Sequence, residues 1–240
     1  MTTMNTELEK QAAARASLAF VNDGYVVGLG TGSTASYAIR FLGELVRAGL
    51  NIRCIPTSNH SRDLAAGLGI PLTDFEECTR IDVTIDGADE ISPVLDLIKG
   101  HGGALLREKI VAAASRKVVI IADSSKQVEG LGKFPLPVEV VPFAQALLAR
   151  RIANLGASVV LRKGRDGRPF VTDEGHYILD CSFGYIADPA RLSEQLQHMP
   201  GVQENGLFLN LADVVLIGRN SKVIELHRPH RHPPDFLEGE

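Results

Sequence analysis

The sequence has few cysteines, no long apolar segment and no strong excess of one charge. Its three cysteines, Cys54, Cys78 and Cys181, lie far apart and outside any CxxC pattern, so we expect neither a disulfide framework nor a zinc site. No apolar run reaches the roughly 18 to 20 residues of a membrane-spanning helix, and the N-terminus lacks the pattern of a secretory signal. The sequence therefore predicts a cytoplasmic protein with no membrane partner.

The charges are nearly balanced. Twenty-five Lys and Arg against 29 Asp and Glu give a net charge of -4 at pH 7. This balance offers no general attraction to nucleic acid, so we expect no nucleic-acid partner, and an anionic ligand must be held by a local site. With 240 residues, of which 45% are hydrophobic, the chain is long enough for a main domain and a smaller companion.

The first half of the chain alternates short β-branched runs with helical patterns. This order is typical of βαβ units and predicts a doubly wound α/β domain with a mostly parallel sheet. The expected strands are apolar throughout because both faces of such a sheet are covered. We expect strands at 25–29, 52–55, 83–85 and 118–122, and helices at 7–20, 34–46, 58–68 and 103–114. Ser58 is the candidate cap of the third helix.

The composition changes near Gly132, where prolines interrupt the apolar pattern. From there we expect a small α+β lobe with a hairpin turn at 164–168 and two helices, at 143–154 and 188–198, the second capped by Asp188. The apolar run 212–218 is typical of the first-half strands and predicts a return to the large sheet. The predicted organisation is a catalytic domain of residues 1–131 and 207–227, a small lobe of residues 132–206 and a flexible tail of residues 228–240.

Ligands of open α/β sheets bind outside the carboxyl ends of the strands, and the first loop of interest is Gly28-Leu-Gly-Thr-Gly-Ser-Thr34. A glycine-rich turn that opens a helix presents backbone N–H groups to an anion. Ser33 stands where a dinucleotide fingerprint needs a third glycine, and the lysine of a nucleotide P-loop is missing. The hydroxyls of Thr31, Ser33 and Thr34 favour a small monophosphate; the alternative is a tight turn with a helix cap.

The second loop, Asp86-Gly-Ala-Asp89, places two carboxylates after a buried strand. These acceptors suit sugar hydroxyls. They also suit a divalent metal, and a helix cap with a solvated partner is equally compatible with the pattern. The sequence around this loop alone does not choose among the three.

The third loop, Lys99-Gly-His-Gly-Gly-Ala-Leu-Leu-Arg-Glu108, carries a lysine and a glycine-rich turn into a helix. Ala104 and Glu108 are four residues apart and share a helix face, so Glu108 is expected to look back toward a ligand of the loop. The alternative is a surface glutamate paired with a lysine.

Together with Lys133-Phe-Pro-Leu-Pro-Val-Glu139, these motifs resemble type A ribose-5-phosphate isomerase, in the order and spacing of that family and as far as about Gly218. The resemblance implies interconversion of ribose 5-phosphate and ribulose 5-phosphate without a cofactor. It implies a Rossmann-like main domain with a smaller α+β domain, assembled as a homodimer or homotetramer.

The same resemblance implies the roles of the site residues. Glu108 would be the base, with Asp86 and Lys99 as further catalytic groups. His101 stands where bacterial members usually have glycine, and we expect its side chain in solvent because the flanking glycines still shape the turn. The implied substrate-binding residues are Lys10, Thr31, Gly32, Ser33, Thr34, Asp86, Gly87, Ala88, Asp89, Lys99, Gly100, His101, Gly102 and Lys126.

Two other functions compete with proton transfer. A metal-assisted hydride shift needs a cluster of His and carboxylate ligands, and the only His-rich stretch holds His227, His230 and His232 in the expected tail. A non-catalytic sugar-phosphate sensor of similar fold would keep the phosphate loop and lose the base. The presence of Glu108 and Lys99 favours the enzyme.

Overall fold

The computed structural model describes residues 3–220 and 222–229. By their contacts the residues form two compact units. Among the described residues, the first unit holds those up to Ala88, Arg107–Lys126 and those from Asn210 onward; the second holds Asp89–Leu106 and Gln127–Leu209. No helix in the described ranges is long and apolar enough to cross a membrane. Most of the tail expected at 228–240 lies outside the described residues.

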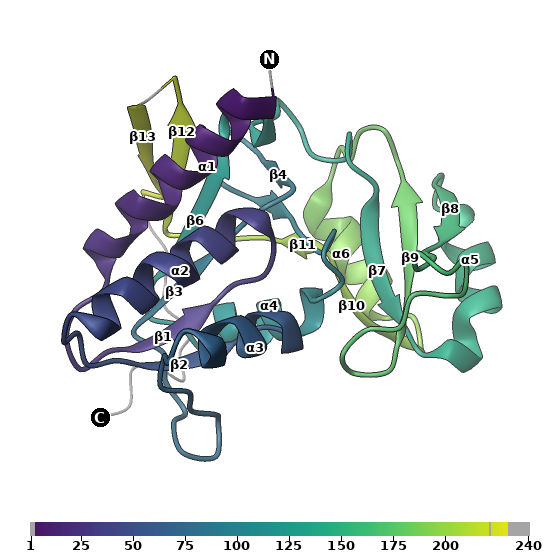
Figure 1. Cartoon of the computed structure of the whole chain (residues 1–240). Helices are drawn as coiled ribbons and strands as arrows, with labels where there is room; N and C mark the ends of the chain where they lie inside the picture. Colours follow the sequence, from purple (N-terminus) through teal and green to yellow (C-terminus); the bar gives the residue numbers. More distant parts are fainter. Residues whose placement is uncertain (1–2, 221, 230–240) are drawn as a thin grey trace. The chain divides into compact units, whose positions relative to one another are not determined.

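The first unit is built on a six-stranded sheet with the order β13-β12-β6-β3-β1-β2 (Figure 1). Five of these strands run parallel, and the edge strand β13 pairs antiparallel with β12. The four strands expected in the first half are confirmed, as is the return of the chain to the sheet at 212–218; β13 was not predicted. The strands are β1 (Val26–Leu29), β2 (Arg53–Pro56), β3 (Val83–Asp86), β6 (Val118–Asp123), β12 (Val214–Arg219) and β13 (Lys222–His227).

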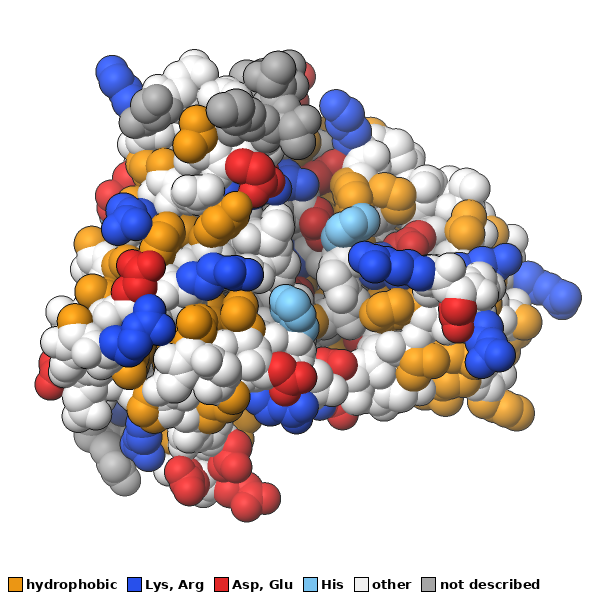
Figure 2. Space-filling view, in the orientation of Figure 1, with side chains coloured by type: hydrophobic (Ala, Val, Ile, Leu, Met, Phe, Trp, Pro, Cys, Tyr) orange, Lys and Arg blue, Asp and Glu red, His pale blue; other side chains and the backbone are white. Residues whose placement is uncertain are grey.

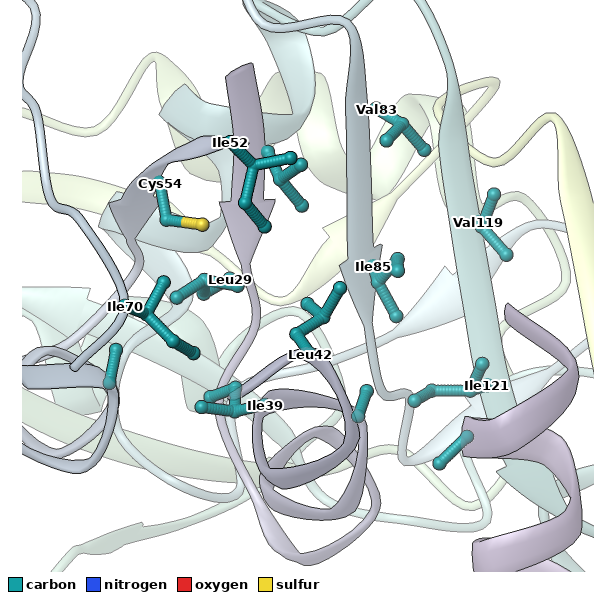
Figure 3. Packing of buried hydrophobic residues seen from close by; sticks show 14 of the residues in the cluster. Leu29, Ile39, Leu42, Ile52, Cys54, Ile70, Val83, Ile85, Val119 and Ile121 are labelled. Atoms are coloured by element: carbon teal, nitrogen blue, oxygen red, sulfur yellow. The ribbon is translucent and has the colours of Figure 1, made fainter. Parts of the chain in front are cut away.

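Helices cover both faces of this sheet because its strands alternate apolar side chains between the faces. On one face, Ile39 and Leu42 of α2 pack against Leu29 and Ile85 (Figure 3), together with residues of α1 and α3. On the other face, Val111 of α4 packs against strand residues that include Ile55. The helices are α1 (Thr3–Ser17, continued by a 3-10 turn at Leu18–Phe20), α2 (Ser33–Arg47), α3 (Asn59–Gly67) and α4 (Leu105–Ala113).

The second unit contains a four-stranded antiparallel sheet, β10-β7-β9-β8, and a three-stranded sheet, β11-β5-β4. The two predicted helices pack on the former: Leu148 of α5 and Leu192 of α6 belong to one core with Val138 and Leu179. The predicted small α+β lobe is confirmed. The elements are β4 (Glu90–Ile91), β5 (Leu97–Ile98), β7 (Leu136–Val140), a 3-10 turn (Pro142–Ala144), α5 (Gln145–Ala153), β8 (Ser158–Leu161), β9 (Tyr177–Ser182), α6 (Pro189–Gln197), β10 (Val202–Asn205) and β11 (Leu207–Phe208).

The segment 89–106 groups by contacts with the second unit, because β4 and β5 pair with each other and with β11 rather than with the six-stranded sheet. Glu90 strengthens this grouping: its Oε2 accepts the N–H of Gly132 at 2.7 Å and its Oε1 accepts the N–H of Phe134. The domain boundaries expected at 131/132 and 206/207 stay a prediction.

The charges on the face shown in Figure 2 are mixed. Basic side chains are interspersed there with acidic and hydrophobic ones. This distribution agrees with the near balance of charge in the sequence, and any strong anion binding on this face must come from a local arrangement of groups rather than from a broad basic surface.

A buried carboxylate makes the stability of the second unit depend on pH. Glu139 of β7 is 1% exposed, and its Oε1 accepts from the Thr172 hydroxyl at 2.8 Å and lies 3.0 Å from Nδ1 of His176. Burial raises the pKa of Glu139 above its ordinary value of 4.5, although the bonds to Thr172 and His176 act in the opposite direction. Folding therefore takes up a proton above pH 4.5, and the free energy of unfolding falls as the pH rises through this range.

The variant Glu139→Gln tests this coupling, because glutamine keeps the acceptor oxygen but cannot ionise. As the pH rises from about 4 to about 7, the free energy of unfolding of the wild type should fall relative to that of the variant. Urea titrations at several pH values measure it. Glu194→Gln, on the exposed side of α6, is the matched control. A difference that stays constant with pH would contradict the assignment.

Candidate active site

The turn at 30–34 joins β1 to α2 and opens that helix toward solvent. Gly32 precedes the helix with a φ of +111°, a conformation that favours glycine, and both Gly32 and Ser33 are exposed while Thr34 is nearly buried. Gly32 has no side chain with which to cap the helix, so a ligand or water must satisfy the amides of its first turn. These amides and the helix dipole suit an anion.

The hydroxyl group of Thr31 forms hydrogen bonds with other side chains of the protein. It donates to Oγ of Ser58 at 2.8 Å, Ser58 donates to Ser61, and Ser61 donates to the carbonyl oxygen of Gly30 at 2.6 Å. Thr57, whose Oγ1 lies 2.8 Å from that of Thr31, donates to the carbonyl of the last residue of β1. This hydroxyl cluster, formed by Thr31, Thr57, Ser58 and Ser61, fastens the turn to the start of α3.

Asp86 ties the same turn to the end of β3. Its side chain is 2% exposed, and its Oδ1 accepts the N–H of Thr31 at 3.0 Å and that of Gly87 at 2.7 Å. A Cβ atom at Gly30 would overlap this carboxylate, so glycine is required there. One oxygen of Asp86 therefore holds the backbone of two loops in place.

Glu108 lies in the first turn of α4 and is 4% exposed. The alternative of a surface glutamate is therefore wrong. The neighbouring Arg107 donates from Nη1 to Oδ1 of Asn59 at 3.2 Å, which links α4 to α3. A buried carboxyl group on an anchored helix is suited to proton transfer because its position is fixed and little water competes for it.

Four further residues of the first unit were predicted to bind substrate. Gly87 and Ala88 are half-buried after β3, and Lys126 is half-buried in the 3-10 turn Ser124–Lys126 that follows β6. Lys10 of α1 lies with its Nζ 2.7 Å from Oε1 of Glu7. Its charge is therefore already engaged by a carboxylate.

The other predicted residues, Asp89 and those of the loop at 99–102, belong to the second unit. Lys99 is 3% exposed; its N–H donates to the carbonyl of Gly206 at 2.9 Å, and its Nζ lies 5.4 Å from the centre of the Phe208 ring. Asp89 accepts the N–H of His101 at 2.9 Å. The arrangement fixes the backbone on both sides of Gly100, whose φ is +108°.

His101 and Gly102 form the exposed part of this loop. The exposure of His101 agrees with the expectation from the sequence. Its ring also meets Phe134 edge-on, with 5.3 Å between ring centres, a contact that the sequence did not predict.

Comparison with known proteins identifies the family. The family model of ribose 5-phosphate isomerase A (phosphoriboisomerase A) matches residues 53–222, well over half of the chain. The chain belongs to this family.

The relatives cover nearly the whole chain. A ribose-5-phosphate isomerase A of Parvibaculum lavamentivorans is 49% identical over an alignment of 230 positions, which covers 92% of this chain and 100% of the relative. That of Nitrobacter hamburgensis is 54% identical over an alignment of 216 positions, which covers 88% of this chain and 93% of the relative. A solved D-ribose-5-phosphate isomerase in complex with phospho-erythronic acid has a TM-score of 0.91 at 39% identity and covers 93% of this chain and 99% of its own. The predicted family and α/β fold are confirmed.

The sequence analysis missed two features of this isomerase: the hydroxyl cluster and the contact of Arg162 with the Lys99 loop. The hydroxyls of Thr57 and Ser61 carried no signal beyond that of Ser58, which was expected to cap a helix and does accept the N–H of Ser61. Arg162, which contacts the Lys99 loop, lies in a hairpin far along the chain. Neither contact follows a spacing rule, because both depend on how distant segments fold together.

The described residues contain no set of side chains suited to bind a metal ion. No group of three or more His, Cys, Asp or Glu side chains is placed there to hold an ion. Nε2 of His227 lies 2.8 Å from Oε1 of Glu225, whereas His230 and His232 lie outside the described residues. The carboxylates Asp86 and Asp89 instead accept backbone N–H groups.

The variant Thr31→Val tests the hydroxyl cluster. Valine keeps the shape of threonine but removes the hydroxyl and leaves buried hydroxyls of the cluster short of a partner, so we expect the free energy of unfolding to fall by about 1 to 3 kcal/mol. Thr31→Ser, which keeps the hydroxyl, should stay near the wild type. Urea unfolding measures both; equal stability of Thr31→Val and the wild type would mean that the hydroxyl does not hold the turn.

Proposed function

We propose that this chain interconverts ribose 5-phosphate and ribulose 5-phosphate with Glu108 as the acid/base group. Its membership of the ribose 5-phosphate isomerase A family assigns the aldose–ketose isomerisation. The observation that carries the residue assignment is the burial of Glu108 in the first turn of α4, in the same unit as the 30–34 turn and Asp86.

The phosphate of the substrate would be held at the start of α2. The amides of Gly32, Ser33 and Thr34 and the positive end of the helix dipole favour an anion there, and Lys126 would add a positive charge. Thr31 would contribute through its backbone and by keeping the turn in shape, because its hydroxyl bonds within the protein. Lys10, paired with Glu7, would contribute mainly to the local potential.

The reaction moves two protons. After the furanose opens, Glu108 would take the proton from C2 of the aldose, leaving an enediolate, and return it to C1; the hydroxyl proton on O2 passes to O1, which completes the ketose. A positioned acid/base group is worth about 10² to 10⁴ in rate. The rest must come from stabilising the negative charge of the enediolate.

The solved relative in complex with phospho-erythronic acid is consistent with this mechanism. That ligand is a four-carbon sugar acid with a phosphate, and its planar carboxylate resembles an enediolate. Compounds that resemble the transition state or a nearby intermediate bind tightly to an enzyme complementary to it.

The charge of the enediolate would be met by Lys99 and by amides of the 100–102 turn other than that of His101, which donates to Asp89. Lys99 is nearly buried, and a cation is worth more where water is excluded. Asp86 and Asp89 would accept hydroxyls of the sugar, since a carboxylate can accept several hydrogen bonds at once. Gly87, Ala88, Gly100, His101 and Gly102 would line the substrate.

We further propose a cytoplasmic homodimer or homotetramer that works without a cofactor. Burial raises the pKa of the thiols of Cys54 and Cys181 to about 12, so both stay protonated and unreactive, as suits a reducing compartment. One carboxylate suffices for both proton transfers at carbon. A sugar-phosphate sensor would have no use for the buried Glu108, which favours the enzyme.

The decisive variant is Glu108→Gln. It preserves size but cannot carry the proton, so kcat should fall by about 10² to 10⁴ while KM changes little. Glu44→Gln, an exposed residue of α2, is the matched control and should behave like the wild type. A coupled assay for ribulose 5-phosphate measures both; near-normal turnover of Glu108→Gln refutes the assignment.

Exhaustive chelation separates proton transfer from a metal-assisted hydride shift. We expect full turnover after prolonged dialysis against a chelator, because the proposed groups are side chains and backbone amides. Turnover that disappears on chelation and returns on addition of a divalent cation would support the hydride shift instead.

A further inference from the structure

Arg162 binds the backbone of the loop that follows Lys99. Its Nη1 donates to the carbonyl oxygens of Gly100 at 2.8 Å and of His101 at 2.9 Å. Its Nε donates to Oδ2 of Asp180 at 2.9 Å, and its Nη2 donates to Oδ1 of the same carboxylate. Two successive carbonyl groups of the loop thus point to one guanidinium, whose side chain is only 12% exposed.

This contact sets the direction of the loop's amides. In a trans peptide the N–H points opposite to the carbonyl, and the described chain contains no cis peptide. The N–H groups of His101 and Gly102 are therefore directed away from Arg162, and that of His101 meets Asp89. The turn needs the positive φ of Gly100. Glycine makes many other backbone conformations accessible to such a loop, and the contact with Arg162 restricts them.

The anchor itself is rigid. The N–H of Arg162 donates to the carbonyl of Ile178, and its own carbonyl accepts from Phe170, each at 2.9 Å. Asp180 lies within β9, which is paired on both sides with β7 and β8. A planar guanidinium can bind a carboxylate with one edge and carbonyls with another, whereas a lysine offers a single point of charge.

We propose that Arg162 is a positioning residue for the isomerisation, an inference that rests on the proposed function. By fixing the two carbonyls, Arg162 keeps Lys99 and the N–H of Gly102 where they stabilise the enediolate. Arg162 does not touch the reacting atoms in this proposal. A displacement of about 1 Å in such a group costs on the order of 10²-fold in rate, so the effect of losing Arg162 is measurable.

The test compares four variants with the wild type. Arg162→Gln should lower kcat by about 10- to 100-fold with little change in KM, and Arg162→Lys should recover only part of the loss. Asp180→Asn removes the ion pair but leaves the bonds to the carbonyls, so it should lower the Tm as much as Arg162→Gln but kcat far less. Arg168→Gln, in the same hairpin and with a side chain that is 86% exposed, should match the wild type.

Two readouts exclude a merely structural role. Substrate deuterated at C2 should show a larger primary isotope effect with Arg162→Gln than with the wild type, because the proton transfer itself becomes slower. Arg162 also lines a cavity of about 720 Å³, so millimolar guanidinium should raise the turnover of Arg162→Ala and not that of the wild type.

The inference is overturned if Arg162→Gln keeps the wild-type kcat and isotope effect while it is fully folded. It is also overturned if Asp180→Asn and Arg162→Gln lose kcat equally, in proportion to their loss of Tm. Both outcomes are distinct from failure of the proposed function. That failure would appear as retained turnover of Glu108→Gln, whereas the C2 isotope effect reports proton transfer whichever carboxylate performs it.

Discussion

The carboxylate of Asp86 holds together the ends of two strands of the large sheet. Its Oδ1 accepts N–H groups from the loop after β1 and from the loop after β3, and Gly30 leaves the space that this contact needs. Parallel strands bring their carboxyl ends to one edge of a sheet, but they do not fix the loops that follow. The bond from Thr31 to Asp86 does so, and with it the start of α2 acquires a fixed direction from which its amides can bind an anion.

The same device recurs in the second unit with different residues. Asp89 and Arg162 hold opposite sides of the 100–102 turn, and Glu90 holds the N–H groups of Gly132 and Phe134. Glycine-rich loops gain freedom to approach a ligand closely and lose conformational order. Charged side chains with little exposure restore that order, so the proposed donors for an oxyanion would be oriented before substrate arrives and would need little reorganisation during the reaction.

The sequence predicted the elements whose signals are local. The buried strands at 83–85 and 118–122 were visible because parallel strands are apolar throughout, and Ser58 and Asp188 both cap helices as their positions suggested. The small sheet of β4, β5 and β11 was missed because its strands are only two residues long and because β11 pairs with a strand far away in the sequence. The contact of Arg162 with Gly100 was missed for the same reason, since it joins residues 62 positions apart. The motif order identified the family, but the inward orientation of the Thr31 hydroxyl required coordinates.

The most direct measurement is a crystal structure of this protein with phospho-erythronic acid bound. The account predicts phosphate oxygens about 3 Å from the amide nitrogens of residues 32–34 and the carboxyl end of the ligand beside the side chain of Glu108. A phosphate bound away from the start of α2, or a Glu108 side chain directed away from the ligand, would contradict it.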